Sequence, residues 1–259
     1  CARALTSIVL PPSLATVGDN AFEGCESLQS IALPQSVVTI GARAFWGCAS
    51  LRSFELPSGI QSVGAGAFRE CDTLSEIVIS PDAERFRVVD GVLFTADGKT
   101  LVAFPRKKET TEYAIPDGVR SVGEKAFCGC KALTSVVFPQ SLQTVGLCAF
   151  ANCKALTSVA LPTELQNFAS SAFAGCDSLT DFVLSPDAAR FRVVDGVLFT
   201  ADGKTLIAFL GDAKLKYAIP NGVERIVDYA FTRRSSLQSV SVPASVQEIG
   251  DAFVDCASL

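Results

Sequence analysis

Apolar and polar positions alternate over short stretches of this chain. In the segment LQSIALP (28–34), the apolar residues Leu28, Ile31 and Leu33 are separated by polar or small residues. This spacing predicts a short strand with one buried face. Pro34 then removes a backbone donor, so the strand is expected to end there.

The residues after this strand predict a tighter return path. Val37, Ile40 and Phe45 supply further inward-facing groups, and Gly41 permits a sharp change of direction. We expect a single helical or 3₁₀ turn that ends at the Gly-Cys pair 47–48. Each unit is therefore predicted to run out as a strand and to return through a compact turn.

The whole pattern recurs with a period of 23 residues. LPPSLATVGDNAFEGC (10–25) returns as LPQSVVTIGARAFWGC (33–48) and as LPSGIQSVGAGAFREC (56–71). Self-similarity of this period is typical of a solenoid, in which each turn buries its apolar face against its neighbours. We expect residues 1–259 to form one solenoid domain of about ten turns, which begin at Leu5, Leu28, Leu51, Leu74, Thr110, Leu133, Leu156, Leu179, Lys214 and Leu237.

Two units are longer than the others and create a second period of 105 residues. They span 74–109 and 179–213, and the 25 residues 80–104 recur at 185–209 with two differences. Asp-Gly pairs in both copies are typical of hairpin turns. The sequence predicts two β-hairpins on the outer side of the solenoid.

Charge and apolar length limit the partners of this segment. The formal net charge is −5, which argues against a nucleic-acid partner because such partners require a concentrated basic surface. No apolar run approaches the roughly 20 residues that span a bilayer. The chain contains no Met and begins and ends in the same part of the repeat, so we expect an excised or processed segment of a longer protein.

The absence of histidine from the sequence removes Ser-His-Asp, Cys-His and histidine–metal sites. The recurring carboxylates Asp90, Asp97, Asp195 and Asp202 leave acid–base catalysis open as an alternative. Each of them precedes Gly, and we favour turn chemistry. We expect no enzymatic activity and no cofactor.

Most of the ten cysteines occupy one position of the repeat. Such residues are expected to stack as a column inside the turns, where free Cys behaves as a small hydrophobe. The parallel side chains of a stack do not suit disulfide geometry, and paired zinc-ligand spacings are absent. We therefore expect free thiols and no metal site. Arg234 is expected either to interrupt the column or to open its turn. The column is formed by Cys25, Cys48, Cys71, Cys130, Cys153, Cys176 and Cys256.

The repeat L-x-x-I-x-L resembles the leucine-rich repeat, and units such as 5–27 are similar to the BspA-like branch of that family. The A-F-x-x-C signature and the hairpin sequence DGVLF-x-x-DGKTL carry this resemblance. It implies an α/β, right-handed leucine-rich-repeat solenoid with a concave parallel sheet. It also implies a secreted or cell-surface protein that adheres to host or neighbouring-cell proteins. Ser36 and Gly59 depart from the Asn of the general consensus, which places the usual asparagine ladder in doubt.

Candidate binding residues are the charges that interrupt a mostly serine column on the strands, together with a tryptophan beside a core phenylalanine. We expect these side chains to be exposed and to contact a protein partner. They are Arg52, Glu55, Glu76, Glu112, Asp181, Lys216 and Trp46.

Three other interpretations remain open at this level. The charges can be ordinary solvated strand residues, and the two hairpins can provide the contact surface instead. The segment can also be a passive scaffold that spaces other domains of a longer protein.

Overall fold

A computed structural model describes residues 2–106, 110–169, 171–185, 187–210 and 215–259. The chain forms two compact units. Unit 1 contains residues 1–109 and 118–129, and unit 2 contains residues 110–117 and 130–259. Lys214, with which one predicted unit begins, lies outside the described residues.

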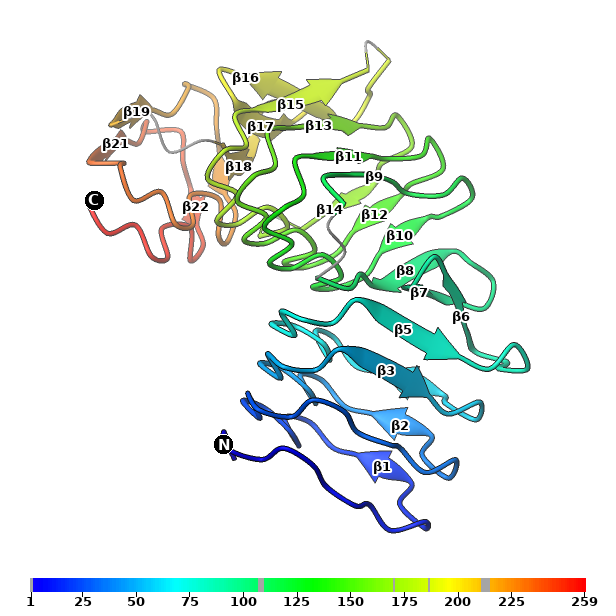
Figure 1. Cartoon of the computed structure of the whole chain (residues 1–259). Coiled ribbons are helices and arrows are strands. Elements are labelled where there is room, and N and C mark those ends of the chain that lie inside the picture. Colours follow the sequence, from blue (N-terminus) through cyan, green and yellow to red (C-terminus); the bar gives the residue numbers. More distant parts are fainter. Residues whose placement is uncertain (1, 107–109, 170, 186, 211–214) are drawn as a thin grey trace. The chain divides into compact units, whose positions relative to one another are not determined.

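The described residues form a β-solenoid of about ten turns, and each regular turn carries up to two strands (Figure 1). From the third turn on, the first strand of a turn follows the opening residue, as predicted; the strand predicted over 28–34 is absent, and the first turn has none at this place either. In unit 1 these first strands are β3 (Ser53–Leu56) and β5 (Glu76–Ile79); in unit 2 they are β9 (Glu112–Ala114), β11 (Ser135–Val137), β13 (Ser158–Leu161), β15 (Asp181–Leu184), β19 (Lys216–Ala218) and β21 (Ser239–Ser241).

A second row of shorter strands follows about nine residues later in each regular turn, and the sequence analysis did not predict it. Except across the hairpins, these strands pair in parallel with the equivalent strand of a neighbouring turn, for example β1 with β2 and β12 with β14. In unit 1 the row contains β1 (Thr16–Val17), β2 (Thr39–Ile40), β4 (Ser62–Val63), β8 (Thr100–Ala103) and β10 (Ser121–Val122); in unit 2 it contains β12 (Thr144–Val145), β14 (Asn167–Phe168), β18 (Thr205–Phe209), β20 (Arg225–Ile226) and β22 (Glu248–Ile249).

The predicted helical and 3₁₀ turns are wrong, because the described residues contain no helix. At the corner 18–25, alternate N–H groups bond within the corner, as from Ala21 to Gly18 O. The intervening N–H groups donate to the next turn, as from Phe22 to Ala44 O at 2.7 Å. Because the N–H groups donate alternately to the corner and to the next turn, and because Asn20 has a positive φ (56°), a continuous helical bond pattern cannot form.

Both predicted hairpins are present, and each belongs to a three-stranded antiparallel element. In unit 1, β6 (Phe86–Val89) pairs with β7 (Val92–Thr95), and β7 pairs with β8. Because β8 is bordered by β7 and β10, the row β1-β2-β4 ends at β4. In unit 2, β16 (Phe191–Val194) and β17 (Val197–Thr200) repeat this arrangement beside β18.

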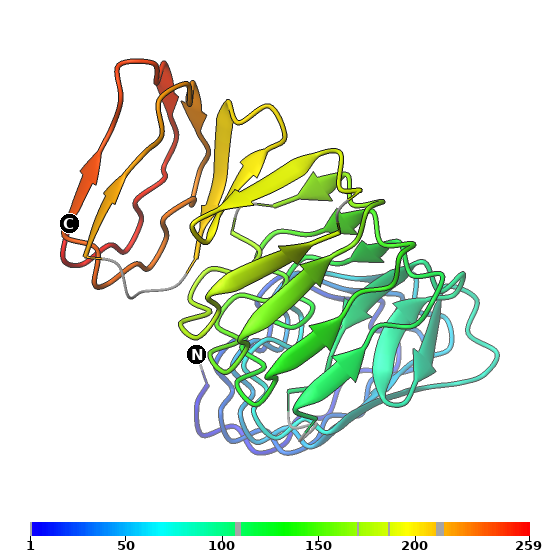
Figure 2. The ribbon, with the colours of Figure 1, turned by 90° about the horizontal axis from the view of Figure 1, so that it is seen from above.

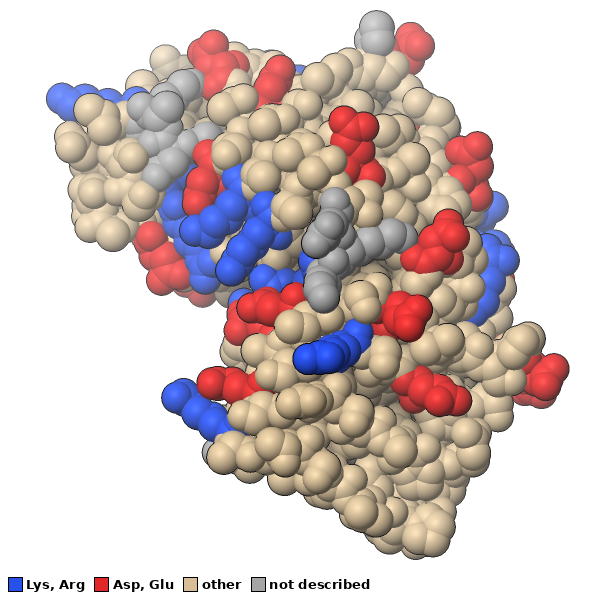
Figure 3. All heavy atoms as spheres, in the orientation of Figure 1, with Lys and Arg blue, Asp and Glu red and all other residues tan. Residues whose placement is uncertain are grey.

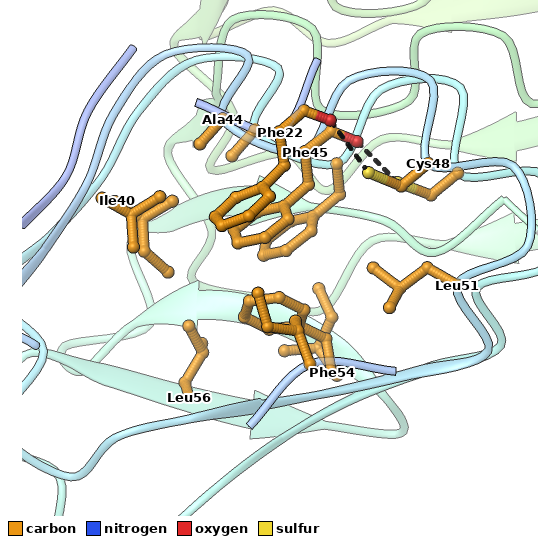
Figure 4. Packing of buried hydrophobic residues seen from close by; sticks show 14 of the residues in the cluster. Phe22, Ile40, Ala44, Phe45, Cys48, Leu51, Phe54 and Leu56 are labelled. Atoms are coloured by element: carbon orange, nitrogen blue, oxygen red, sulfur yellow. Dashed lines mark hydrogen bonds between the residues drawn. The ribbon is translucent and has the colours of Figure 1, made fainter. Parts of the chain in front are cut away.

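The core of each turn is a stack of phenylalanine rings (Figure 4). Phe22 lies parallel to Phe45 with ring centroids 5.2 Å apart, and Phe54 packs edge-on against Phe45 at 4.7 Å. In unit 2, Phe150 and Phe173 stack at 5.0 Å. Offset stacks and edge contacts of this kind add to the free energy gained by burial.

The cysteine column lies beside these rings, and six of its seven members are buried as predicted. Each sulfur faces the preceding turn: the Cys48 thiol donates to Phe22 O at 3.3 Å, and the Cys71 thiol donates to Phe45 O at 3.1 Å (Figure 4). Burial, together with nearby Cys25, raises the pKa of Cys48 to about 12. These thiols are therefore protonated and unreactive at neutral pH.

Arg234 interrupts the column without opening its turn. Its residue exposure is 3%, so the guanidinium stays inside. In the following turn, the Cys256 thiol donates to Phe231 O at 3.0 Å and restores the pattern.

Serine replaces the asparagine ladder of the general consensus. Ser36 Oγ lies 2.7 Å from both Pro12 O and Leu14 O in the preceding turn. Ser245 Oγ donates to Val223 O at 2.8 Å and accepts from Gly222 N at 3.1 Å. A hydroxyl is therefore sufficient to satisfy the backbone groups at this corner.

Replacement Phe150→Ala is expected to lower the free energy of unfolding by about 3–5 kcal/mol, because Phe150 is fully buried and the change leaves a cavity. Equilibrium denaturation of the purified segment measures this loss. Val137→Ala on the exposed strand face is the control and is expected to change stability by less than about 0.5 kcal/mol. Equal effects of the two changes would contradict the inward assignment of Phe150.

The cysteines are expected to react with a thiol reagent in two classes. Cys148 and Cys256, which are partly exposed, should label first in the folded segment at pH 8. The buried column should label only upon unfolding, because its thiols are inaccessible in the folded segment. Mass spectrometry of labelled peptides distinguishes the classes, and the unfolded, unreduced chain should yield about ten free thiols; a count near zero would disprove the free column.

Candidate recognition surface

Strand alternation places the predicted charged residues of unit 1 on the exposed face of β3 and β5. Phe54 and Ile77 point into the core, while Glu55 and Glu76 are exposed. The parallel register pairs Ser53 with Glu76. Arg52, immediately before β3, is also exposed, so the structure brings these three charges onto neighbouring strands.

The corresponding strands of unit 2 form a four-stranded parallel sheet, visible as the green-to-yellow arrows in Figures 1 and 2. Its register places one row of residues side by side: Glu112 pairs with Ser135, Ser135 with Ser158, and Ser158 with Asp181. Glu112 and Asp181 therefore mark the two ends of a row whose middle is serine. With about 4.8 Å between strands, the row is about 14 Å long.

A second row on the same face is apolar. It lies two residues further along each strand and contains Val137 and Val183, which are 59% and 52% exposed. Ala160 pairs with Val183, and Ala114 pairs with Val137. In unit 1, Val78 is 45% exposed and pairs with Glu55.

The sequence analysis missed this apolar row. The signal was present, because the fifth residue of these units is Ala or Val where a solvated strand would carry polar groups. Exposed valines beside a serine row make the strand face amphipathic. Exposed apolar groups in a contiguous row are a feature of protein-contact surfaces.

Two of the seven predicted residues lie apart from these rows. Lys216 is exposed on β19, which pairs only with β21 among the described strands. The expectation that Trp46 is exposed needs correction, because its ring is partly buried at a corner of unit 1. It lies between Arg43 and Arg69, whose guanidinium carbons are 5.1 and 4.9 Å from the ring centre.

A shallow groove of about 270 Å³ lies on the strand face of unit 1. Its walls include Ser30, Ala32, Ser53 and Glu55 from two successive turns. Figure 3 shows the surface over β3 and β5 as largely uncharged, with isolated acidic groups. The groove therefore offers small neutral side chains with a carboxylate at its border.

The aspartates of the hairpins have structural roles. Asp97 Oδ1 accepts hydrogen bonds from Lys99 N at 2.9 Å and from Thr95 Oγ1 at 2.7 Å, and these bonds lower the pKa of Asp97. Asp202 makes the same contacts with Thr200 and Lys204, with the same effect on its pKa. Asp90 and Asp195 have φ of 51° and precede Gly at the other turn of each hairpin.

Neither a metal cluster nor a membrane-crossing element is found in the described part of the chain. No three or more Cys, Asp or Glu side chains lie close enough together there to hold a metal ion. None of the described elements is a helix of the length and apolarity that crossing a membrane requires.

Comparison with solved structures identifies other leucine-rich repeat proteins. A leucine-rich cell surface protein from Faecalibacterium prausnitzii is 30% identical, with a TM-score of 0.66 over 98% of this chain and 58% of its own. The pneumococcal vaccine antigen PcpA is 20% identical, with a TM-score of 0.65 over 96% of this chain and 64% of its own. A leucine-rich repeat protein from Eubacterium ventriosum is 20% identical, with a TM-score of 0.54 over 95% of this chain and 75% of its own.

The chain spans less than two thirds of the first two of these proteins. A comparison with curated protein sequences gives no match. The model of the BspA type leucine-rich repeat region matches residues 1–88, 102–192 and 208–259 in six copies. The chain therefore belongs to the BspA type leucine-rich repeat family.

Proposed function

We propose that this segment is a non-enzymatic recognition module of a secreted or cell-surface protein, and that it adheres to host or neighbouring-cell proteins through its first-row strands. The observation that carries the proposal is the amphipathic strand face, in which Val137 and Val183 lie beside the row from Glu112 to Asp181. The similar Faecalibacterium protein is described as a cell surface protein, which supports an exported location.

The geometry favours a protein partner over a small molecule. The strand faces of the two units are repeated surfaces, and the groove on unit 1 is shallow and open. A partner that lays apolar side chains on the valine row and basic groups near Glu112 and Asp181 would match both rows. Repeat proteins commonly bind through such extended surfaces.

The alternative is a passive scaffold that spaces other domains of a longer protein. The observation that favours it is the coverage, since the segment spans 58% and 64% of two similar proteins. The two functions differ in whether the segment itself binds.

Binding of the segment to a panel of immobilised extracellular-matrix and serum proteins distinguishes these proposals. A strand-face variant with Glu76→Lys, Asp181→Lys, Val137→Ser and Val183→Ser should bind at least about tenfold more weakly than the parent, because it changes both rows. Saturable binding of the parent together with this loss is the expected result.

The matched control carries Asp82→Lys and Asp187→Lys, two exposed residues that precede the hairpins. It makes the same charge reversals away from the strand face and should bind as the parent does. If this control loses binding while the strand-face variant retains it, the hairpin regions are the contact surface. If the segment binds no protein of the panel, the scaffold function is favoured.

A further inference from the structure

A narrow crevice in unit 1, unrelated to the strand face, is surrounded by cations. It lies where the corner of the third turn meets the corners of the next two turns, beside the first hairpin. Its walls include Arg69, Arg106 and Lys125, whose side chains are only 19%, 8% and 12% exposed. Three basic groups buried to this degree around one space are unusual, because burial of charge is costly.

The crevice originates in a shortened corner. Ten residues separate Thr100 from the opening residue of the next turn, whereas 12 separate the equivalent Thr16 from Leu28. Phe104 N still donates to Ala126 O at 2.9 Å, as Phe45 N does to Ala67 O in the regular stack. The backbone stack therefore continues. Because this corner has fewer residues than the regular corner, it leaves space that long basic side chains enter.

Two glycines with positive φ make room for these side chains. A Cβ on Gly66 (φ 64°) would lie 2.9 Å from Cδ of Lys125. A Cβ on Gly129 (φ 80°) would lie 2.7 Å from an Nη atom of Arg106. The equivalents of Gly66 in other turns, such as Asn20 and Arg43, carry side chains at positive φ, so its missing side chain is specific to this crevice.

Two of the cations around the crevice have a donor without an acceptor among the described residues, whereas Lys125 Nζ donates to Glu124 Oε1 at 2.5 Å. Arg106 Nε and Nη2 donate to Gly129 O at 2.9 and 2.7 Å, and Nη1 lies 2.5 Å from Asp72 Oδ1 without the alignment of a hydrogen bond. Arg69 Nε is buried and has no acceptor among the described residues. Buried donors of this kind normally bond to an ordered water or ion.

The carboxylates that pair with these cations are much more exposed. Glu70, Asp72 and Glu124 have side-chain exposures of 47%, 55% and 38%. Arg69 Nη2 and Glu70 Oε1 are 3.4 Å apart, which is a loose contact. Because solvent screens the carboxylates more than it screens the cations, the interior of the crevice is expected to be positive.

We propose that this crevice binds a single halide ion, chloride in physiological solution. Its volume is about 20 Å³, whereas one water-sized occupant needs roughly 10–15 Å³ on this measure. The space thus suits one small spherical anion better than a polyatomic anion such as phosphate. The ion would lie between the side chains of Arg69 and Lys125 and link the third turn to the fifth.

Thermal unfolding of the segment in sodium chloride and in sodium gluconate at equal ionic strength tests the proposal. An ion that binds only the folded state raises the midpoint in a saturable way. We expect the midpoint in chloride to exceed that in gluconate by on the order of 3 °C at saturation. Bromide should reproduce the effect, and crystals grown in bromide should show an anomalous peak beside Arg69 Nε.

Lys125→Met removes one charge and retains the chain that packs on Gly66. This variant should lose most of the difference between chloride and gluconate. Lys154→Met is the matched control, because Lys154 is exposed and pairs with Asp177 at 3.4 Å on a corner of unit 2. It should retain the full difference. Because the measured quantity is the difference between the unfolding midpoints in two salts, a general loss of stability does not produce the expected result.

Equal midpoints of the parent in chloride and gluconate would overturn the proposal, as would an unchanged salt difference in Lys125→Met. A crevice that contains only water in the bromide crystal would also overturn the proposal. In that case the cations would be solvated by a water that satisfies Arg69 Nε.

Discussion

The fold depends on backbone hydrogen bonds between successive turns, which mostly join residues 22 to 24 positions apart because the repeat is 23 residues long. Each turn donates to its neighbour in the strand rows and again at the corner, as from Gly41 N to Val17 O at 2.8 Å and from Gly64 N to Ile40 O at 2.8 Å. The backbones approach so closely that a Cβ on Gly64 would lie 2.3 Å from Ala42 N. At Gly64 itself no side chain fits without a shift of the backbone, whereas in unit 2 Ala169 and Val227 occupy the equivalent position and keep the same bond to the preceding turn.

This register explains why single residue types run through the molecule as columns. Phe45 lies on Phe22, and Cys48 approaches the carbonyl of Phe22, because equal positions of successive turns are superposed. The same register places Ser135 beside Glu112 on the surface. Columns on the inner side of the strands therefore build the core, and columns on the outer side build a repeated surface. A local change in sequence alters the core and the surface at the same turn.

The two hairpins show how the stack accommodates an insertion. In unit 1 the inserted strand β7 takes the place beside β8 that β4 would otherwise occupy, and the row of β1, β2 and β4 ends. The corner after β8 is shortened in sequence, and Arg106 donates from its side chain to Gly129 O of the next turn. The near-identity of the two hairpins has a structural explanation too, since Thr95, Asp97 and Lys99 bond to one another as their counterparts do.

Sequence alone predicted the features that depend on one residue in each turn. The strand face of Glu55 and Glu76, the buried cysteines and the Asp-Gly turns follow from spacing, and the structure agrees. The helical corners were wrong because the choice between helix and turn depends on hydrogen bonds to the next turn, such as Phe22 N to Ala44 O. Local propensity contains no information about such distant acceptors.

The position of Trp46 illustrates the same limit for side chains. Its own unit suggests an exposed ring, but Arg69 from the next turn lies over it at 4.9 Å. Arg69 also borders the crevice beside the first hairpin, so one guanidinium joins a regular corner to the irregular one that follows. Arg69 is therefore a packing element of this corner, with its side chain only 19% exposed. The charged groups on regular strands keep their predicted exposure, since their neighbours are unchanged in register.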